Sequence, residues 1–432
     1  MLIGAGINNK RKIALKYRWV IFTVLAIGYA IVYFHRVSPA LVVPELTKAF
    51  QIKGAALGIL ASAYFYPYAI MQLPSGLLSD SLGPRKTVTI FTLIAAGGAI
   101  LFGISPTFFV SIIGRIIVGL GVSVLFVPTL KILANWFEIK KFSMITGILM
   151  AIGGIGWLLA ATPLALLTLW VGWRVTFIII GLVSLILALL IYLIVRDNPA
   201  QLGLPKIIEA QNTTSVSYQE EKIPLFKGIK MVVFEKKFWP LAIWFFCTGG
   251  ILFGFGGLWA GPYLTQVYHL SKTQTGNILM MIAVGMIIGS PILSYLSQKV
   301  FNARKPILLI SSSIIVGIWI VFISLIDGLN LPFLYVLFFL LGTFASGIVV
   351  IGFTAAKELF PTQIVGTSIG MINLFPFAGG ALLQPLTGFI LDCTGKLGNV
   401  YSIQAYRISF GGFLLIAIVA LISVPFMKET LS

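Results

Sequence analysis

The sequence predicts an all-α membrane protein of twelve transmembrane helices arranged in two pseudo-symmetric six-helix halves. The 432 residues are 59% hydrophobic and 10% charged, with a mean hydropathy of +1.04, whereas soluble domains carry about 25% charged residues. Apolar runs of about 20 residues, enough to cross a roughly 30 Å hydrocarbon layer as a helix, recur along the chain. The loops after the second and eighth runs share a plan, which indicates an internal repeat.

Other classes of protein fit the composition poorly. The apolar runs are too long and alternate too little to be strands of a membrane barrel. The net charge of +18 does not predict nucleic-acid binding, because the bases lie in short loops rather than along a stripe of a soluble module. Cys247 and Cys393 supply no disulfide framework. We find no metal-ligand cluster, phosphate-cradling loop or nucleophile triad in the sequence, so we expect neither an enzyme nor a cofactor.

Twelve spans divide evenly around one polar segment. The N-terminal half (residues 1–195) and the C-terminal half (238–432) flank a linker of residues 196–237, which is rich in Lys and Glu and which we expect to be cytoplasmic. The predicted spans are roughly 18–43, 54–79, 86–105, 107–136, 142–168, 173–195, 238–267, 275–298, 306–326, 332–357, 364–391 and 404–427.

Basic residues predict the orientation of these spans. With the N terminus inside, the inner segments hold 21 of the 30 Lys and Arg residues, the outer segments hold six, and three lie within spans. Because cytoplasmic loops carry the excess of Lys and Arg, both termini should be cytoplasmic. We expect a multi-pass monomer of the cytoplasmic (inner) membrane, surrounded by the lipid bilayer.

Three basic side chains fall within spans, namely Arg36, Arg115 and Lys131, whereas all 12 acidic residues fall outside spans or near their ends. A charge in hydrocarbon is costly and marks a functional site by default. Buried cations are unfavourable unless an anion, carbonyl groups or water surround them. This imbalance predicts a small anionic substrate.

Arg36 in the first span is the main candidate for binding that anion. Tyr29, Tyr33 and Arg36 are spaced i, i+4, i+7 and share one helix face. A guanidinium group can bind a carboxylate or phosphate through two parallel hydrogen bonds, and the phenols could hold the rest of the ligand. The alternative is that Arg36 snorkels to the outer surface. His35 points about 100° away and is either a proton carrier or a hydrogen-bonded packing residue.

Further substrate-binding candidates lie in three other spans. Tyr64 and Tyr68 share a face of the second span with Gln72, because they are spaced i, i+4, i+8. Polar amides deep in spans need partners, which makes them cavity or interhelical groups. We therefore add Asn373 and Gln384 in the eleventh span, and Trp259 in the seventh, to the candidates for substrate binding. The alternative is that the aromatic side chains of these spans only pack against lipid or neighbouring helices.

Arg115 and Lys131 cannot both face one cavity on a straight helix. They are 16 residues apart in the fourth span, which places them about 160° apart around an ideal helix. A kink at Pro128 would remove this conflict. Lys131 lies near the inner end, where we expect an anchor or a residue of an inner vestibule.

The internal repeat involves the short inner loops. The segment "GLLSDSLGPRKTV" (76–88) has a counterpart "YLSQKVFNARKPI" 219 residues later, in which Arg304 and Lys305 correspond to Arg85 and Lys86. Lys299 replaces Asp80 in the second copy. Two halves built on one loop plan are typical of carriers in which one half moves against the other around a site at the membrane midplane.

At this point the residues resemble a known family, the major facilitator superfamily of secondary transporters. Its loop pattern between the second and third spans, G-x-L-x-D-x-x-G-x-R-K, is matched by Gly76, Leu78, Asp80, Gly83, Arg85 and Lys86. "GRIIVGLG" (114–121) is similar to the family's fourth-span pattern, which places Arg115 at a position that is structural or tied to proton coupling. The resemblance covers the whole chain apart from the linker.

The resemblance implies an inner latch. Asp80 at the end of the second span would face the positive N-terminal end of the eleventh span, near Thr362–Gly366. Gly76 and Gly83 shape the turn, and Arg85 and Lys86 would bind carbonyls or acids beneath the N-terminal half. The contact would hold the cytoplasmic side shut and break when the protein opens inward. The alternative is that the two bases only follow the positive-inside rule.

Within the family, "GYAIVYFHRVSPALVVPEL" (28–46) and "KELFPTQIVGTSIGMINLFPFAGGALLQPLTG" (357–388) look like organic-anion carriers, including sugar-phosphate permease-like and lysosomal dipeptide transporter-like branches. Two features depart from related patterns. The seventh span has no Arg to pair with Arg36, unlike typical phosphate-ester carriers, and the fifth span lacks the Gly-Pro pair typical of proton-coupled drug exporters.

We therefore expect a secondary active transporter that moves a small organic anion, such as a carboxylate, an amino acid or a short peptide, by rocker-switch alternating access. Without an ATP site, transport should run on gradients, with protons as one coupling ion to be tested. Two alternatives stay open: a proton-coupled drug or siderophore exporter, and a non-transporting membrane sensor.

Overall fold

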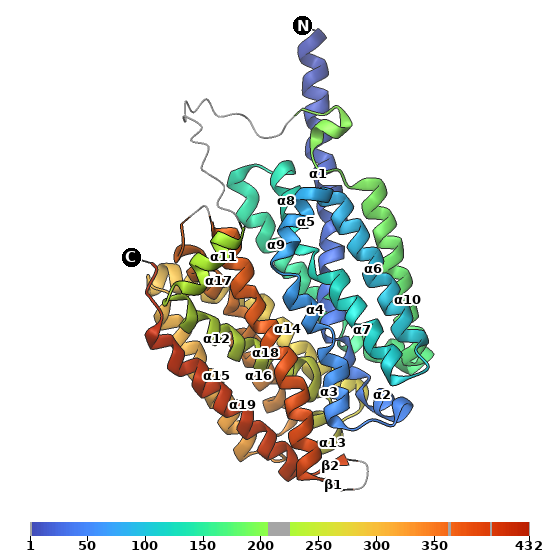
Figure 1. Ribbon diagram of the computed structural model, residues 1–432, viewed down its shortest axis with the longest axis vertical. Coiled ribbons are helices and arrows are strands. Elements are labelled where there is room, and N and C mark those ends of the chain that lie inside the picture. The colour runs from blue at the N-terminus through green and yellow to red at the C-terminus, as the bar shows by residue number, and fades with distance from the viewer. Residues whose placement is uncertain (1, 206–224, 362–363, 398–399, 432) are drawn as a thin grey trace.

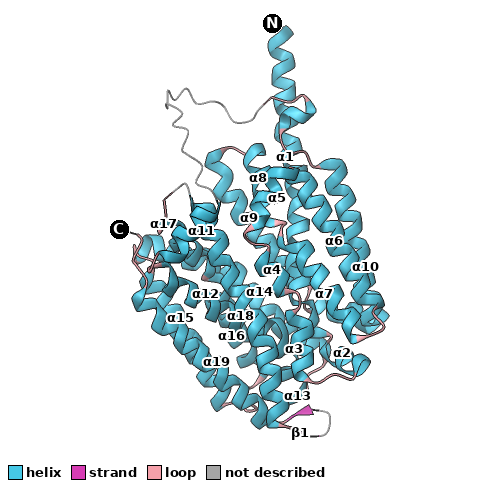
Figure 2. Ribbon diagram, in the orientation of Figure 1, coloured by secondary structure: helices cyan, strands magenta, loops and turns pink. Residues whose placement is uncertain are grey.

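The computed structural model is a bundle of long helices that describes residues 2–205, 225–361, 364–397 and 400–431 (Figures 1 and 2). The N terminus and helix α11 (Leu225–Phe234) lie toward the top of Figure 1, at what we call the inner end of the bundle. The hairpin of β1 (Lys396–Leu397) and β2 (Val400–Tyr401) lies at the opposite, outer end. These two names follow the orientation predicted from the charges.

Ten α-helices precede the linker within the described part of the chain. They are α1 (Leu2–Val37), α2 (Val43–Phe50), α3 (Gly54–Ser62), α4 (Phe65–Ile70), α5 (Pro74–Leu82), α6 (Pro84–Ile104), α7 (Phe108–Ser123), α8 (Phe126–Trp136), α9 (Ile139–Leu159) and α10 (Thr162–Ile194), with a 3₁₀ turn η1 (Ser38–Leu41) after α1. Another 3₁₀ turn, η2 (Pro199–Leu202), opens the linker.

The second part of the chain repeats this helical plan. After α11 it contains α12 (Phe238–Ile251), η3 (Leu252–Trp259), α13 (Ala260–Val267), α14 (Lys272–Tyr295), η4 (Leu296–Val300), α15 (Lys305–Ser324), α16 (Leu331–Leu341), η5 (Gly342–Gly347), α17 (Val349–Glu358), α18 (Val365–Thr394), α19 (Ile403–Ser423) and η7 (Val424–Phe426). Segments η3 and η5 are π-helical turns that join flanking α-helices into continuous spans, and the π-helical turn η4 ends the span that begins with α14.

These helices account for twelve spans. Ten stretches of the described chain are long and apolar enough to cross a membrane, and the pair Gly54–Ile70 and Pro74–Leu82, bent by 63°, makes one more. The stretch Met144–Ile194 has 51 residues, about 76 Å of helix, which is more than twice the hydrocarbon thickness. It is interrupted at Gly172, where φ is 75°. It therefore supplies two spans, and the predicted fold class is confirmed.

The spans bend where the sequence places proline. The second span breaks into α3, α4 and α5 around Pro67 and Pro74, because proline lacks the backbone donor that an uninterrupted helix needs. The fourth span breaks at Val124–Leu125, between α7 and α8, and Pro128 lies in the first turn of α8, where proline is tolerated. The fourth span is therefore interrupted just before Pro128, but the interruption does not bring Arg115 and Lys131 into one cavity, because neither residue lines the cavity.

Backbones of the two halves touch in the outer part of the bundle, where α3 packs along α18. A Cβ atom on Gly58 would come within 2.5 Å of the carbonyl oxygen of Gln384, and one on Gly54 would come within 2.9 Å of the carbonyl oxygen of Gly388. Only glycine permits such close approach. The contact brings the two halves together on the outer side of the molecule.

Two features differ from the sequence-based prediction. The first helix extends over Leu2–Val37 rather than 18–43, because no proline precedes Pro39, and residues 38–41 then tighten into the 3₁₀ turn η1. The outer loop before the last span forms the β1–β2 hairpin, in which Lys396 pairs with Tyr401, whereas the sequence predicted no strand there.

Candidate functional site

A cavity of about 360 Å³ lies between the two halves of the chain. In the N-terminal half it is lined from α1, α4, α8 and α9, and in the C-terminal half from α12, η3, α14, η5, α17 and α18. Its lining extends from Arg36 toward the inner ends of the helices, reaching Ser294 near the end of α14 and Phe353 in the middle of α17. The cavity therefore occupies the middle and inner part of the bundle.

Arg36 is the charged residue of this lining. Its side chain is nine-tenths or more buried, and Nη2 donates a hydrogen bond of 2.9 Å to the hydroxyl of Tyr68. Nε has no hydrogen-bond partner, and Arg36 forms no ion pair within the described chain. A buried guanidinium without a counter-charge is a ready binding site for an anion.

Aromatic rings surround the Arg36 guanidinium. Its Cζ atom lies 4.5 Å from the ring centre of Tyr33, 4.9 Å from Phe377, 5.1 Å from Tyr68 and 5.4 Å from Phe253. These are cation–π distances, which stabilise the cation while its hydrogen-bonding edge stays available. Three of the predicted binding residues, Tyr33, Arg36 and Tyr68, thus meet in one cluster.

Tyr29 and Asn373 also line the cavity. The ring of Tyr29 stacks on Phe126 at 5.2 Å and meets Tyr33 edge-on at 5.4 Å. Asn373 Nδ2 donates a hydrogen bond of 2.6 Å to the side-chain oxygen of Gln72. This bond joins α18 to the second span, so Asn373 links the two halves as well as facing the cavity.

Three predicted binding residues lie outside the cavity lining, which corrects their place in the site. Trp259 Nε1 donates to the backbone carbonyl of Gln384 at 2.9 Å, and Gln384 Nε2 donates to the carbonyl of Phe253 at 2.9 Å. These bonds satisfy polar groups where η3 packs on α18, which is a structural role. Tyr64 is fully buried behind Tyr68, with the two rings stacked at 5.6 Å.

The predicted coupling residues His35 and Arg115 form a second buried cluster behind the cavity wall. His35 Nε2 lies 3.4 Å from Ser184 Oγ on α10, so its side chain faces away from the cavity. Arg115 Nη1 donates a hydrogen bond of 3.0 Å to the carbonyl of His35, and its Cζ lies 5.0 Å from the ring of Tyr64. Arg115 therefore ties α7 to α1 through a backbone carbonyl.

The residues of the predicted inner latch bond within the N-terminal half in this structure. Asp80 forms an ion pair with Lys131 on α8, and both side chains are exposed. Arg85 donates from its side chain to the carbonyl of Tyr192 and from its backbone N–H to Asp197 at 2.7 Å. The part of the predicted partner site at residues 362–363 lies outside the described residues.

The turn that carries this loop depends on one glycine. Gly83 joins α5 to α6 with φ at 85°, which L-residues with side chains rarely adopt. Gly76 has open space around its Cα atom and Lys86 is exposed, so neither makes a close contact here. The loop places its charges on the inner surface of the molecule.

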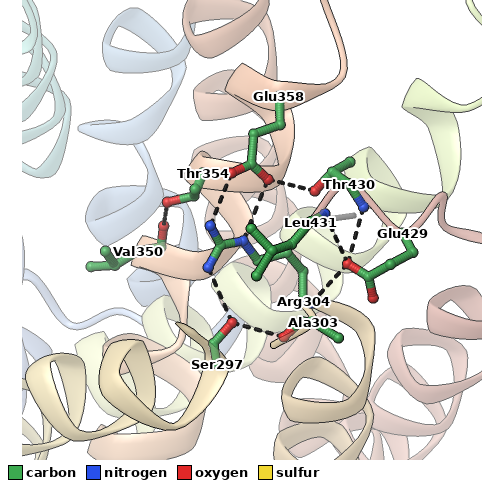
Figure 3. A network of polar contacts seen from close by, with 9 residues as sticks. All are labelled: Ser297, Ala303, Arg304, Val350, Thr354, Glu358, Glu429, Thr430 and Leu431. Atoms are coloured by element: carbon green, nitrogen blue, oxygen red, sulfur yellow. Dashed lines mark hydrogen bonds and ion pairs between the residues drawn. The ribbon is translucent and has the colours of Figure 1, made fainter. Parts of the chain in front are cut away.

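A matching network lies under the C-terminal half (Figure 3). Arg304 Nη2 pairs with Glu358 at the end of α17 at 2.9 Å. Glu429 accepts hydrogen bonds from the backbone N–H groups of Arg304 and Lys305, at 2.8 and 2.9 Å, and so caps α15. Partial burial acts to raise the pKa of Glu429, but these backbone donors outweigh it and hold the pKa below its usual range.

On the outer side, a carboxylate joins the two halves. Asp392 at the end of α18 accepts hydrogen bonds from the backbone N–H groups of Gly54 at 3.0 Å and Ala55 at 2.8 Å, at the start of α3. The hydroxyl of Tyr401 donates to the same carboxylate at 2.7 Å. Glu45 and Lys272 form an ion pair between the halves. The outer ends are thus bonded together, whereas the cavity extends inward.

The sequence pattern missed several residues of the cavity wall. Trp157, Phe126 and Phe253 line the cavity, together with Ser290 and Ser294 of α14. Phe253 lies in the π-helical turn η3, whose extra residue per turn shifts the side chains relative to an α-helical projection. The run of glycines in this segment was the signal that could have indicated an irregular turn.

The chain matches the model of the Major Facilitator Superfamily over residues 25–383, with a second match over 258–430. A probable sulfoacetate transporter of Cupriavidus necator is 21% identical, with 96% of this chain and 97% of that protein covered. A membrane sensor protein of Escherichia coli is 24% identical, with 89% of each chain covered.

Among solved structures, the chain is similar to a bacterial homologue of the human lysosomal transporter Spinster, captured in an inward-facing and occupied conformation. The TM-score is 0.73 with 16% sequence identity, and the match covers 95% of this chain and 96% of that one. At this identity the similarity concerns the fold, which agrees with the twelve spans described above.

Proposed function

The chain belongs to the major facilitator superfamily, and from this premise we propose that it is a secondary active transporter of small organic anions. The observation that carries the proposal is Arg36, a buried cation that faces the cavity and has no acidic partner in the described chain. The relative from Cupriavidus necator, named for an organic anion, supports the same substrate class.

The arrangement of the two halves supports a rocker-switch mechanism. Inter-half bonds at Asp392 and at the Glu45–Lys272 pair hold the outer side together, while the cavity extends toward the inner end of α14. We infer an inward-open state, in which the latch formed by Asp80 with the eleventh span is released. Closing the inner side and parting the outer one would move the cavity's access across the membrane.

The orientation and the coupling ion belong to the same proposal. The excess of Lys and Arg at the inner end favours a cytoplasmic membrane location with both termini in the cytoplasm. A proton partner would have to bind outside the cavity wall, because no carboxylate of the described residues lines the cavity and His35 faces α10. We propose that the transporter acts as a monomer, since its two halves together enclose the site.

Uptake into proteoliposomes tests the proposal. Purified protein should accumulate labelled organic anions, and Arg36→Ala should abolish accumulation because the cavity loses its cation. The matched control is Arg407→Ala, which removes an exposed arginine near the outer end of α19, a helix that does not line the cavity. Both variants should keep the unfolding temperature of the parent protein within a few degrees.

Undiminished accumulation by Arg36→Ala would remove Arg36 from the site and with it the basis of the proposal. A membrane sensor is the second candidate, because one relative carries that name. In that case an anion would raise the unfolding temperature through binding, but no flux would accompany it. The exporter alternative loses support, because the cavity lining carries no acid to exchange against a cation.

A further inference from the structure

The aromatic rings around Arg36 restrict how an anion can reach the guanidinium. Tyr33, Tyr68, Phe253 and Phe377 each present a ring face to the group, at 4.5 to 5.4 Å from Cζ. Rings over the faces of a planar cation leave its edges for hydrogen bonding. The unpaired Nε of Arg36 marks the edge at which a flat carboxylate could form two parallel hydrogen bonds.

The rings next to this entry share one orientation. Phe253 and Phe377 lie 5.5 Å apart with an angle of 10° between their planes, and Trp157 lies 6.5 Å from Phe253 with an angle of 22°. All three line the cavity. Aromatic groups prefer offset stacking at 4.5–7 Å. A flat ring on the ligand could continue this column, whereas a puckered ring would contact it poorly.

The charge of the cavity sets the charge of its ligand. Arg36 is balanced by one negative charge, and no further base lines the cavity within the described chain. Arg115 cannot serve as a second cation, because it is fully buried behind Tyr64 and bonded to the carbonyl of His35. A second negative charge on the ligand would stay unpaired among apolar side chains, which is unfavourable.

The wall around the body of the ligand is mostly apolar. Ser290 Oγ donates to the carbonyl of Met286 at 2.7 Å, and the Asn373 amide donates to Gln72 at 2.6 Å. Further hydroxyl groups line the cavity at Tyr29, Tyr33, Ser294 and Ser346, whereas side chains such as Ile287 and Val350 are apolar. A sugar hydroxyl that faces these apolar side chains would lose its hydrogen bonds to water without replacement.

We propose that the cavity takes a singly charged organic acid with a flat, mostly apolar body, that is, an aromatic or unsaturated monocarboxylate. This inference rests on the proposed transport of organic anions and narrows its substrate class. The carboxylate pairs with the edge of Arg36, and the body stacks along Trp157, Phe253 and Phe377. Doubly charged phosphate esters and polyhydroxylated acids are poor ligands of the same site.

Four matched probes separate the charge, the shape and the polarity of the ligand. Benzoate is flat and singly charged, cyclohexanecarboxylate is puckered and singly charged, terephthalate is flat and doubly charged, and glucose 6-phosphate is polar and doubly charged. Each is added to the purified full-length protein, and the shift of the unfolding temperature gives relative affinities. We expect benzoate to bind most tightly, with cyclohexanecarboxylate weaker and the two dianions weakest.

Ring variants test the stacking directly. Phe377→Leu keeps the wall apolar but removes one ring face, and should weaken benzoate binding by about tenfold while it changes cyclohexanecarboxylate binding much less. Phe389→Leu on the same helix is the control, because Phe389 is exposed on the outside of the bundle. Arg36→Ala should remove the binding of benzoate altogether.

The outcomes distinguish this inference from the proposed function. If glucose 6-phosphate or terephthalate binds more tightly than benzoate and depends on Arg36, the protein is an anion carrier and only the inferred substrate class is wrong. Equal loss of both monocarboxylates in Phe377→Leu would also overturn the role of the rings. If none of the four probes binds or accumulates, the proposed function and the inference fall together.

Discussion

Arg36 shows how a buried charge is kept available for a ligand. A lone guanidinium in an apolar wall is unfavourable, and the structure lowers its free energy with one hydroxyl partner, Tyr68, and four aromatic faces rather than with a carboxylate. A carboxylate partner would have to be displaced by every incoming anion. Aromatic faces stabilise the cation without competing for its hydrogen-bonding edge. Without a carboxylate partner, Arg36 can bind an incoming anion without first losing an ion pair.

The tyrosines beside Arg36 depend on a glycine of the neighbouring helix. A Cβ atom on Gly153 of α9 would come within 2.8 Å of the Tyr33 ring and 3.0 Å of the Tyr29 ring. Gly153→Ala should therefore displace both rings and weaken anion binding by several-fold, because Tyr33 covers one face of the guanidinium. Isothermal titration of the purified variant with the same anion as the parent protein measures this change.

Ile155→Ala is the matched control for that experiment. It lies on the same helix, but its side chain is exposed and does not line the cavity. Its affinity should stay close to that of the parent protein. A Gly153→Ala variant that binds as tightly as Ile155→Ala would show that the positions of Tyr29 and Tyr33 do not matter for the ligand.

At the scale of the helices, the sequence predicts which side chains share a helix face better than it predicts what that face contacts. Tyr29, Tyr33 and Arg36 share a face because helical spacing is a local property, and they meet in the cavity as expected. Trp259 and Gln384 were also predicted to bind substrate, yet their side chains form hydrogen bonds between η3 and α18. The sequence of one helix does not reveal which groups lie opposite its faces. Helix breaks at Pro67 and Pro74 were predictable for a local reason as well, namely the missing backbone donor.

The contacts between helices of different halves had no local signature. Asp392 and Gly54 are 338 residues apart in sequence, and nothing in either segment indicates that one caps the other. The π-helical turn η3 likewise shifts Phe253 into the cavity by an irregularity that a regular projection cannot show. The fold class and the role of Arg36 as the cation of the cavity could therefore be predicted. The aromatic rings around Arg36 and the contacts between the outer ends of the two halves could be found only from the structure.

The cap at the start of α3 should control how firmly the outer side closes. Asp392→Asn keeps the shape but removes the charge that accepts hydrogen bonds from Gly54, Ala55 and Tyr401. Hydrogen bonds to a charged group contribute about 1.5–3 kcal/mol, so the variant should shift molecules toward an outward-open state. Spin labels on cysteines at positions 48 and 407, in a background without Cys247 and Cys393, report the change as longer distances between the outer ends.

Asp327→Asn provides the comparison for the outer cap. Asp327 is an exposed acid in the loop between α15 and α16, also on the outer side but within one half. Its neutralisation should leave the distance distribution as in the parent protein. Identical distributions in Asp392→Asn and Asp327→Asn would mean that the cap does not contribute to outer closure.

At the scale of the whole molecule, the proposed rocker-switch mechanism requires the bonded outer side to open. Glu45 on α2 and Lys272 at the start of α14 pair across the two halves, and both are at least partly buried. Helix α2, which carries Glu45, lies near the outer end of the bundle, whereas the cavity lining reaches toward the inner end (Figure 1). A covalent bond in its place would hold the outer side shut while the cavity stays open to the inner side.

Cysteines at positions 45 and 272, in a background without Cys247 and Cys393, allow this bond to be made with a short bifunctional thiol reagent. Crosslinked protein should lose accumulation of labelled anion in proteoliposomes but still bind the anion in detergent, because the inward-open cavity is unchanged. Each single cysteine, treated with the same reagent, should transport as before. Accumulation that continues after complete crosslinking would contradict the rocker-switch proposal, because the two halves would then not need to part at their outer ends for the substrate to pass.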